Sequence, residues 1–230
     1  MSALTLEHSS VQKVLEIAEE LVKENKVLTT KILYNRAKHR LKIPRNGLLK
    51  IIQLLIDRRV IVDGSRFTRD SVLSHDIRNF IYSIIENEIG IHFSELKRKV
   101  DSVSAISTGQ LIWHLEMLLK FDLIKKVKFT KYTIFLPIDI EDQLGIIYFL
   151  LKDEINLSIL KLLSEKSNLQ KSNLYETLEE EREKVYYHIK TLQDYGIIMV
   201  KADILSIVPE IENTIKFIFK NMHIQLINED

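Results

Sequence analysis

Basic residues are grouped in the first third of the sequence, where their types suit contact with a polyanion. The basic residues are Lys38, His39, Arg40, Lys42, Arg45, Lys50, Arg58, Arg59, Arg66 and Arg69, and the polar Asn46 lies among them. Arg and Asn side chains can form paired hydrogen bonds with guanine and adenine edges, whereas Lys mainly meets phosphate. The pattern predicts nucleic-acid contact through Arg45, Asn46, Lys50 and Arg66, and a solvated basic surface is the alternative interpretation.

A second basic group lies in the middle of the chain. Lys125, Lys126, Lys128 and Lys131 fall in a short segment of strand character, and such a segment is suited to phosphate contact, for which we single out Lys125, Lys128 and Lys131. Thr108 could lie near a base or a phosphate. The outward positions that follow Thr108 are less suitable for contact with a DNA groove, because they include Ile112, Trp113 and Glu116. His114 and, later in the chain, His188 are expected to be packed, hydrogen-bonded histidines.

The last third of the chain is acidic where the earlier parts are basic. Glu179, Glu180, Glu181 and Glu183 precede or open a predicted helix. Carboxylates there repel phosphate and favour the positive end of a helix. Tyr186 and Tyr187 on the same helix are typical of a protein interface.

The central stretch Ser107–Pro137 shows which elements position these groups. Leu111, Leu115 and Leu118 have helical spacing, and Ser107 with Gln110 has the spacing of a capping box. The alternation over 127–136 then predicts two short strands that end at Pro137. A helix followed at once by a small basic hairpin predicts the second half of a winged helix.

The run GQLIWHLEMLLKFDLI resembles the archaeal and bacterial winged helix-turn-helix regulators, in which an HLxxLxxxGLI pattern marks the recognition helix and the entry to the wing. Asp122 stands here where the pattern has Gly, so the turn out of the helix is expected to differ. The resemblance implies a winged-helix fold. It also implies DNA binding, although the same fold serves as a protein-binding module.

Similar apolar positions recur three times along the chain. Leu48, Leu111 and Val185 correspond, and each corresponding helix is expected to be followed by a strand. The predicted fold is therefore mainly α with small β-hairpin wings, as three tandem winged-helix domains. The expected bounds are 1–73 (first segment), 74–138 (second segment) and 139–230 (third segment, with an additional C-terminal helix).

The first segment is expected to have its wing at Val60–Phe67, with Asp63–Gly64 as the hairpin turn. The C-terminal helix is expected over Glu210–Met222. Its apolar side, which includes Ile215 and Phe219, would be exposed unless paired. The sequence therefore predicts a homodimer or a protein partner bound through residues 139–230.

Composition narrows the possible functions. The three segments carry net charges of +6, +2 and −7, from 14, 9 and 10 Lys and Arg against 8, 7 and 17 Asp and Glu. A basic front and an acidic rear predict different partners for the two ends. There is no cysteine, secretory signal or long apolar run, so we expect a cytoplasmic protein without a membrane span. No catalytic motif is present, and we expect neither enzymatic activity, nor a cofactor, nor a metal.

These observations favour a regulator of transcription that binds duplex DNA through the first and second segments. The alternative is a tandem winged-helix adaptor that binds protein, as in ESCRT-II-like or RNA-polymerase-associated subunits. The acidic third segment and Trp113 favour that alternative. Binding to single strands or RNA is the weakest hypothesis, because aromatic residues are not interleaved with the basic ones.

Overall fold

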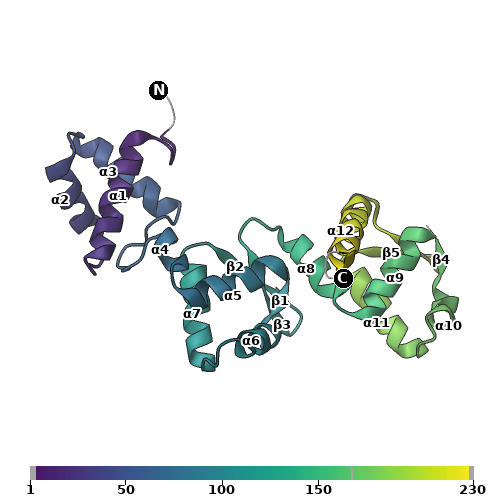
Figure 1. Ribbon diagram of the computed structural model, residues 1–230. Helices are drawn as coiled ribbons and strands as arrows, with labels where there is room; N and C mark the ends of the chain where they lie inside the picture. The colour runs from purple at the N-terminus through teal and green to yellow at the C-terminus, as the bar shows by residue number, and fades with distance from the viewer. Residues whose placement is uncertain (1–3, 167, 228–230) are drawn as a thin grey trace. The chain divides into compact units, whose positions relative to one another are not determined.

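The computed structural model describes residues 4–166 and 168–227. The chain divides into two compact units, Met1–Gly145 and Ile146–Asp230. Both units are mainly helical with a small antiparallel sheet (Figure 1), as the sequence predicts. The first and second segments each have their own apolar core inside the first compact unit.

The first segment begins with three helices, α1 (Ser9–Lys23), α2 (Thr30–Arg40) and α3 (Arg45–Asp57). Apolar residues at helical spacing form the buried sides of α1 and α3. Thr29 caps α2, since its side chain accepts a hydrogen bond from the backbone N–H of Ile32. These caps and apolar sides place α2 and α3 as a helix-turn-helix pair, joined by residues 41–44.

The expected wing of the first segment is absent. A turn does form at Asp63–Gly64, where Gly64 has a φ of 79°, but the flanking residues form only isolated bridges, Leu28 to Ser65 and Ile61 to Thr68. The Asp63 carboxylate accepts hydrogen bonds from the backbone N–H of Thr30 at 2.6 Å and from its hydroxyl at 3.1 Å. The loop is thereby tied to the start of α2 instead of projecting as a hairpin.

The second segment contains α4 (Arg69–Leu73), α5 (Asp76–Asn87), β1 (Ile91–His92), α6 (Phe93–Asp101), α7 (Thr108–Lys120), β2 (Ile124–Phe129) and β3 (Tyr132–Pro137). Its sheet has the order β1-β3-β2. The predicted capping box starts α7, because Ser107 and Gln110 each bond the other's backbone N–H, at 3.2 and 2.8 Å. The helix and the two predicted strands are thus confirmed.

The third segment starts with α8 (Asp142–Leu151), and the boundary between the compact units falls within this helix. The elements that follow are α9 (Glu154–Glu165), β4 (Leu169–Gln170), η1 (Lys171–Asn173), α10 (Leu174–Leu178), α11 (Arg182–Asp194), β5 (Ile198–Lys201), β6 (Ile204–Ile207) and α12 (Pro209–Ile227). The sheet has the order β4-β6-β5, the same pattern as in the second segment.

The three equivalent helices α3, α7 and α11 end in the same way. Each is followed by a residue of positive φ: Arg59 at 51°, Asp122 at 48° and Gly196 at 66°. The N–H groups of this residue and of the next return to the last turn of the helix in all three cases, with the bonds expected where a left-handed residue ends a helix. Asp122 therefore adopts the same left-handed conformation as Gly196 at the equivalent position after α11, and the turn out of α7 does not differ from the turn out of α11.

All three predicted helices are present, and a strand follows α7 and α11, whereas only the bridge at Ile61 follows α3. The repeated helix endings support the register found in the sequence. The division into three winged-helix domains stays a prediction.

The side of α12 that carries Ile211, Ile215 and Ile218 is buried within the chain. Ile215 is fully buried and Phe219 half-buried, so this apolar side is not left open for a second molecule. Ile215 is therefore not available for contact with a second molecule, because the chain itself covers this side of the helix. Within the described residues, no helix combines the length and the apolar character needed to cross a membrane.

Candidate nucleic-acid interface

The start of α3 presents polar side chains to solvent. Arg45, Asn46 and Lys50 are all exposed, and in the described part of the chain neither Arg45 nor Lys50 has an ion-pair partner. Asn46 and Lys50 are four residues apart and lie on one side of the helix. Pro44 precedes the helix and offers no side-chain cap, so the first N–H groups of α3 remain open to an anion. The three residues are therefore arranged as the sequence predicts.

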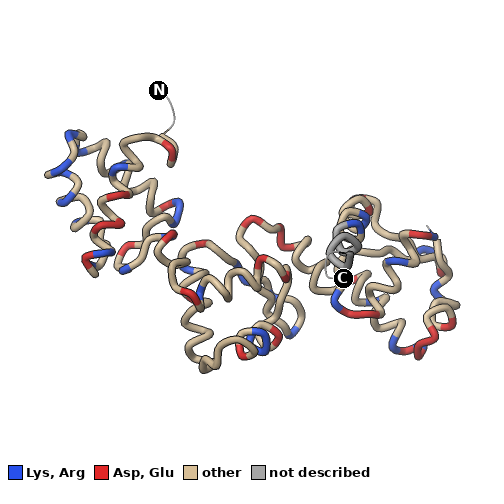
Figure 2. Tube along the Cα trace, viewed as in Figure 1, with Lys and Arg blue, Asp and Glu red and all other residues tan. Residues whose placement is uncertain are grey.

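The end of α2 adds positive charge beside α3, and Figure 2 shows Lys and Arg along α2. Two of these arginines are engaged within the segment: Arg36 pairs with Glu24 at 3.0 Å, and Arg40 pairs with Glu20. Lys38 is exposed, and no described carboxylate pairs with it. The available charge is therefore smaller than the number of basic residues indicates.

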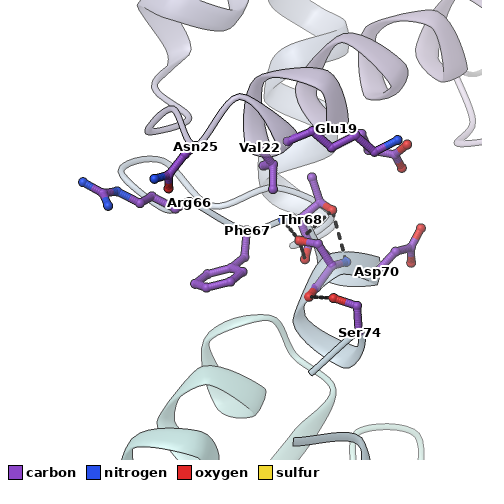
Figure 3. A pocket seen from close by; sticks show the side chains of 10 residues that line it. Glu19, Val22, Asn25, Arg66, Phe67, Thr68, Asp70 and Ser74 are labelled. Carbon is purple, nitrogen blue, oxygen red and sulfur yellow. Dashed lines mark hydrogen bonds between the residues drawn. The ribbon is translucent and has the colours of Figure 1, made fainter. Parts of the chain in front are cut away.

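The arginines around the missing wing point to different places. Arg66 is exposed and lines a cavity of about 680 Å³ together with residues of α1, and its guanidinium extends outward (Figure 3). Arg59 Nε lies 3.7 Å from the Asp122 carboxylate, and Arg69 donates to the Asp122 carbonyl at 3.4 Å. Arg59 and Arg69 thus contact the second segment, whereas Arg66 remains available.

Thr108 is the first residue of α7 and is exposed. The outward side of this helix is apolar further along, since Ile112 and Trp113 are 47% and 48% exposed. An open groove of about 400 Å³ runs between this side and the sheet, lined by Ile112, Glu116, Lys126 and other residues. The helix offers few groups that could read base edges.

The β2–β3 hairpin divides its lysines between two sides. Lys125 forms an ion pair with Asp142 at 2.7 Å, and Lys131 lies over the ring of Tyr132, 5.4 Å from its centroid. Lys128 is exposed, and Lys126 is exposed two residues before it, on the same face of the strand. Lys125 is thus engaged by a residue outside the strand, whereas Lys126 and Lys128 are exposed.

In the third segment, acidic residues surround the start of α11. Glu180 pairs with Lys184 at 2.9 Å, and the cations of Lys171 and Arg182 lie 4.7 and 5.1 Å from the centroid of the Tyr186 ring. Tyr187 is 68% exposed, so it is the freer of the two tyrosines predicted for an interface.

The two histidines differ in their bonding. Nδ1 of His188 lies 3.0 Å from the Asn156 side-chain oxygen, so His188 is hydrogen-bonded as predicted. His114 is buried, but its Nδ1 has no partner among the described residues, and that part of the prediction is wrong. Burial, together with the nearby His75 and Arg78, lowers the pKa of His114 to about 4. The described residues contain no group of three or more side chains suited to holding a metal ion.

Comparison with known proteins identifies the central part of the chain. A family model of an N-terminal helix-turn-helix domain matches residues 75–143, which include α5 to β3. An uncharacterized HTH-type transcriptional regulator of Methanocaldococcus jannaschii is 35% identical over 178 residues. The chain is thus similar to a helix-turn-helix domain in its central part and, over most of its length, to one archaeal helix-turn-helix regulator. The match covers 75% of this chain and 44% of the relative, so the chain spans less than half the length of that regulator.

Proposed function

We propose that this chain is a DNA-binding part of a transcription regulator, and that duplex DNA binds to the first and second segments. The single observation that carries the proposal is the exposed, unpaired basic start of α3, the second helix of a helix-turn-helix pair. In winged-helix and helix-turn-helix proteins this helix enters the major groove with its first residues near the bases. The relationship to helix-turn-helix regulators supports the same assignment.

In this proposal Arg45 and Asn46 lie in the groove and Lys50 lies near a phosphate. The side chains of Arg45 and Asn46 can each form paired hydrogen bonds with base edges, and these bonds would give a sequence preference. Lys126 and Lys128 on the hairpin would contact phosphate, and Arg66 would contribute charge from the first segment. The wing rather than α7 carries the contact of the second segment, because the exposed side of α7 is apolar at Ile112 and Trp113.

The third segment would serve assembly rather than DNA contact. It carries a net charge of −7, and the carboxylates near α11 would repel phosphate. Tyr186, Tyr187 and Phe219 are the predicted interface residues that retain some exposure, and Tyr187 is the most exposed. We therefore place any protein partner there.

Fluorescence anisotropy with random and genomic duplexes, measured at several salt concentrations, tests the proposal. Arg45→Ala should cost about 1–3 kcal/mol on a preferred sequence and little on others, because a base contact is lost. Lys128→Met should weaken binding to all sequences and make the salt slope shallower by about one unit or less.

Lys201→Met is the matched control, since Lys201 is an exposed strand lysine of the acidic third segment. It should leave binding unchanged. If the full chain shows no salt-dependent binding to any duplex at low ionic strength, the DNA proposal is wrong and the adaptor hypothesis is preferred.

A further inference from the structure

A buried arginine in the second segment lacks a polar partner. Arg78, in the first turn of α5, is 1% exposed. Its Nε and Nη1 atoms have no hydrogen-bond partner, and no described carboxylate forms an ion pair with it. Burial lowers the pKa of Arg78 from its ordinary value. A buried charge without a partner is costly, so this arrangement requires an explanation.

Two aromatic rings hold the guanidinium of Arg78. Its Cζ lies 5.0 Å from the centroid of the Phe67 ring and 5.2 Å from that of Trp113. Phe67 comes from the end of the first segment, and Figure 3 shows its ring pointing away from α1. Cation–π contacts offset part of the cost of burying the charge. They leave the Nε–H and Nη1–H groups without an acceptor.

Two histidines and the start of α5 surround Arg78. His114, 5% exposed, has an unpartnered Nδ1, and its ring lies 5.1 Å from that of His75. His75 precedes α5 and does not cap it with its side chain, so N–H groups of the first turn lack an intrahelical partner. The proton affinity of His114 is reduced by both His75 and Arg78. Asp76, the acidic residue of this turn, is exposed and forms no ion pair with Arg78.

We propose that Arg78, His75, His114 and the start of α5 form a binding site for a small oxyanion, a phosphate or a carboxylate group. Such a group would accept a hydrogen bond from the Nε–H or from an Nη1–H of Arg78, which lie on opposite sides of the guanidinium, and a guanidinium suits both kinds of anion. Access is from the side of His75 and Trp113, which are exposed, and requires the Trp113 side chain to move. The inference does not depend on DNA binding.

The site carries its own reporter, because Trp113 is the only tryptophan in the chain. The full chain is titrated with inorganic phosphate and, separately, with acetate, and the ionic strength is held constant with chloride. We expect a saturable change in tryptophan fluorescence with at least one of the two anions and none with chloride. Arg78→Met should weaken binding by about tenfold or more, as expected for loss of charge-assisted hydrogen bonds. Arg98→Met is the matched control, since Arg98 is exposed on α6. The affinity of this variant for the anion should equal that of the wild type.

A second variant covers the case in which Arg78→Met does not fold. His75→Gln replaces an exposed residue and should weaken binding about threefold without changing the circular dichroism spectrum, because the histidine contributes a single contact. An unchanged affinity in either folded variant, or a fluorescence response to both anions equal to that of chloride, would overturn the proposal.

The anion could come from a small molecule or from the DNA backbone. Three results together would show that the site binds a backbone phosphate. Duplex DNA would produce the same fluorescence change, free phosphate would compete with the DNA, and Arg78→Met would abolish the change. If wild-type and Arg78→Met chains bind duplex equally and only the wild type responds to free phosphate or acetate, the ligand is a small anion. Because the anion titration is made without DNA, its failure is distinct from a failure of the proposed DNA binding.

Discussion

Replacing His114 should remove a specific part of the pH dependence of stability. The pKa of this histidine is about 4 in the folded chain, against an ordinary value of 6.5. Burial is the main cause, followed by the neighbouring His75 and Arg78. The folded state therefore keeps His114 neutral over a range in which the unfolded chain protonates it. The contribution of neutral His114 to the free energy of unfolding is fully present above about pH 6.5 and is lost as the pH falls towards about 4.

The magnitude follows from the two pKa values. The linkage relation gives a loss of about 2 kcal/mol at pH 5 relative to pH 8, and about 3 kcal/mol when the pH is well below 4. His114→Met keeps an apolar side chain of similar size in the core, so that variant should lack this part of the pH dependence. Other titrating groups are the same in both proteins and cancel in the comparison.

Urea unfolding at about pH 8 and about pH 5 measures the effect, with the fluorescence of Trp113 as the signal. Trp113 adjoins His114, with ring centroids 5.0 Å apart, so it reports the unfolding of this part of the chain. The wild type should lose about 2 kcal/mol more than His114→Met over this range. Equal losses in the two proteins would show that His114 is not held neutral by burial.

Two other substitutions test the packing and capping of the second segment by the same assay. Gly145→Ala should cost about 1–2 kcal/mol, because its added Cβ would lie 2.4 Å from both methyl carbons of the fully buried Leu136. Gly109→Ala on α7 is its control and should stabilise by about 0.5–1 kcal/mol, since the nearest atom would be 3.9 Å away; equal effects of the two would contradict the close packing. Ser107→Ala should cost about 1 kcal/mol by removing the capping box of α7, and an unchanged urea midpoint would refute that role.

Local signals in the sequence were sufficient for the elements that depend on neighbouring residues. The Ser107–Gln110 pair predicts the start of α7, and the change of period after it predicts β2 and β3. The basic start of α3 is likewise exposed, as its position on the helix predicts. Each of these features is set by residues within a few positions.

The differences arise where distant residues meet. The loop of the first segment does not form a hairpin because Asp63 bonds Thr30, which is 33 residues away. Lys125 forms an ion pair with Asp142, which lies outside its strand. Ile215 is buried within the chain, and the sequence of its own helix does not show this. Arg78 had a usable signal, since it shares one side of α5 with the buried Ile81 and Ile85.

Asp122 links the first segment to the second through both its side chain and its backbone. Glycine would adopt its positive φ at lower energetic cost. The aspartate also offers a carboxylate to Arg59 and a carbonyl to Arg69. Arg59 itself follows α3 with a positive φ, so the ends of α3 and α7 are joined through one pair of side chains. A duplication that copied one segment alone would lose this link, whereas one that copied both segments together would inherit it.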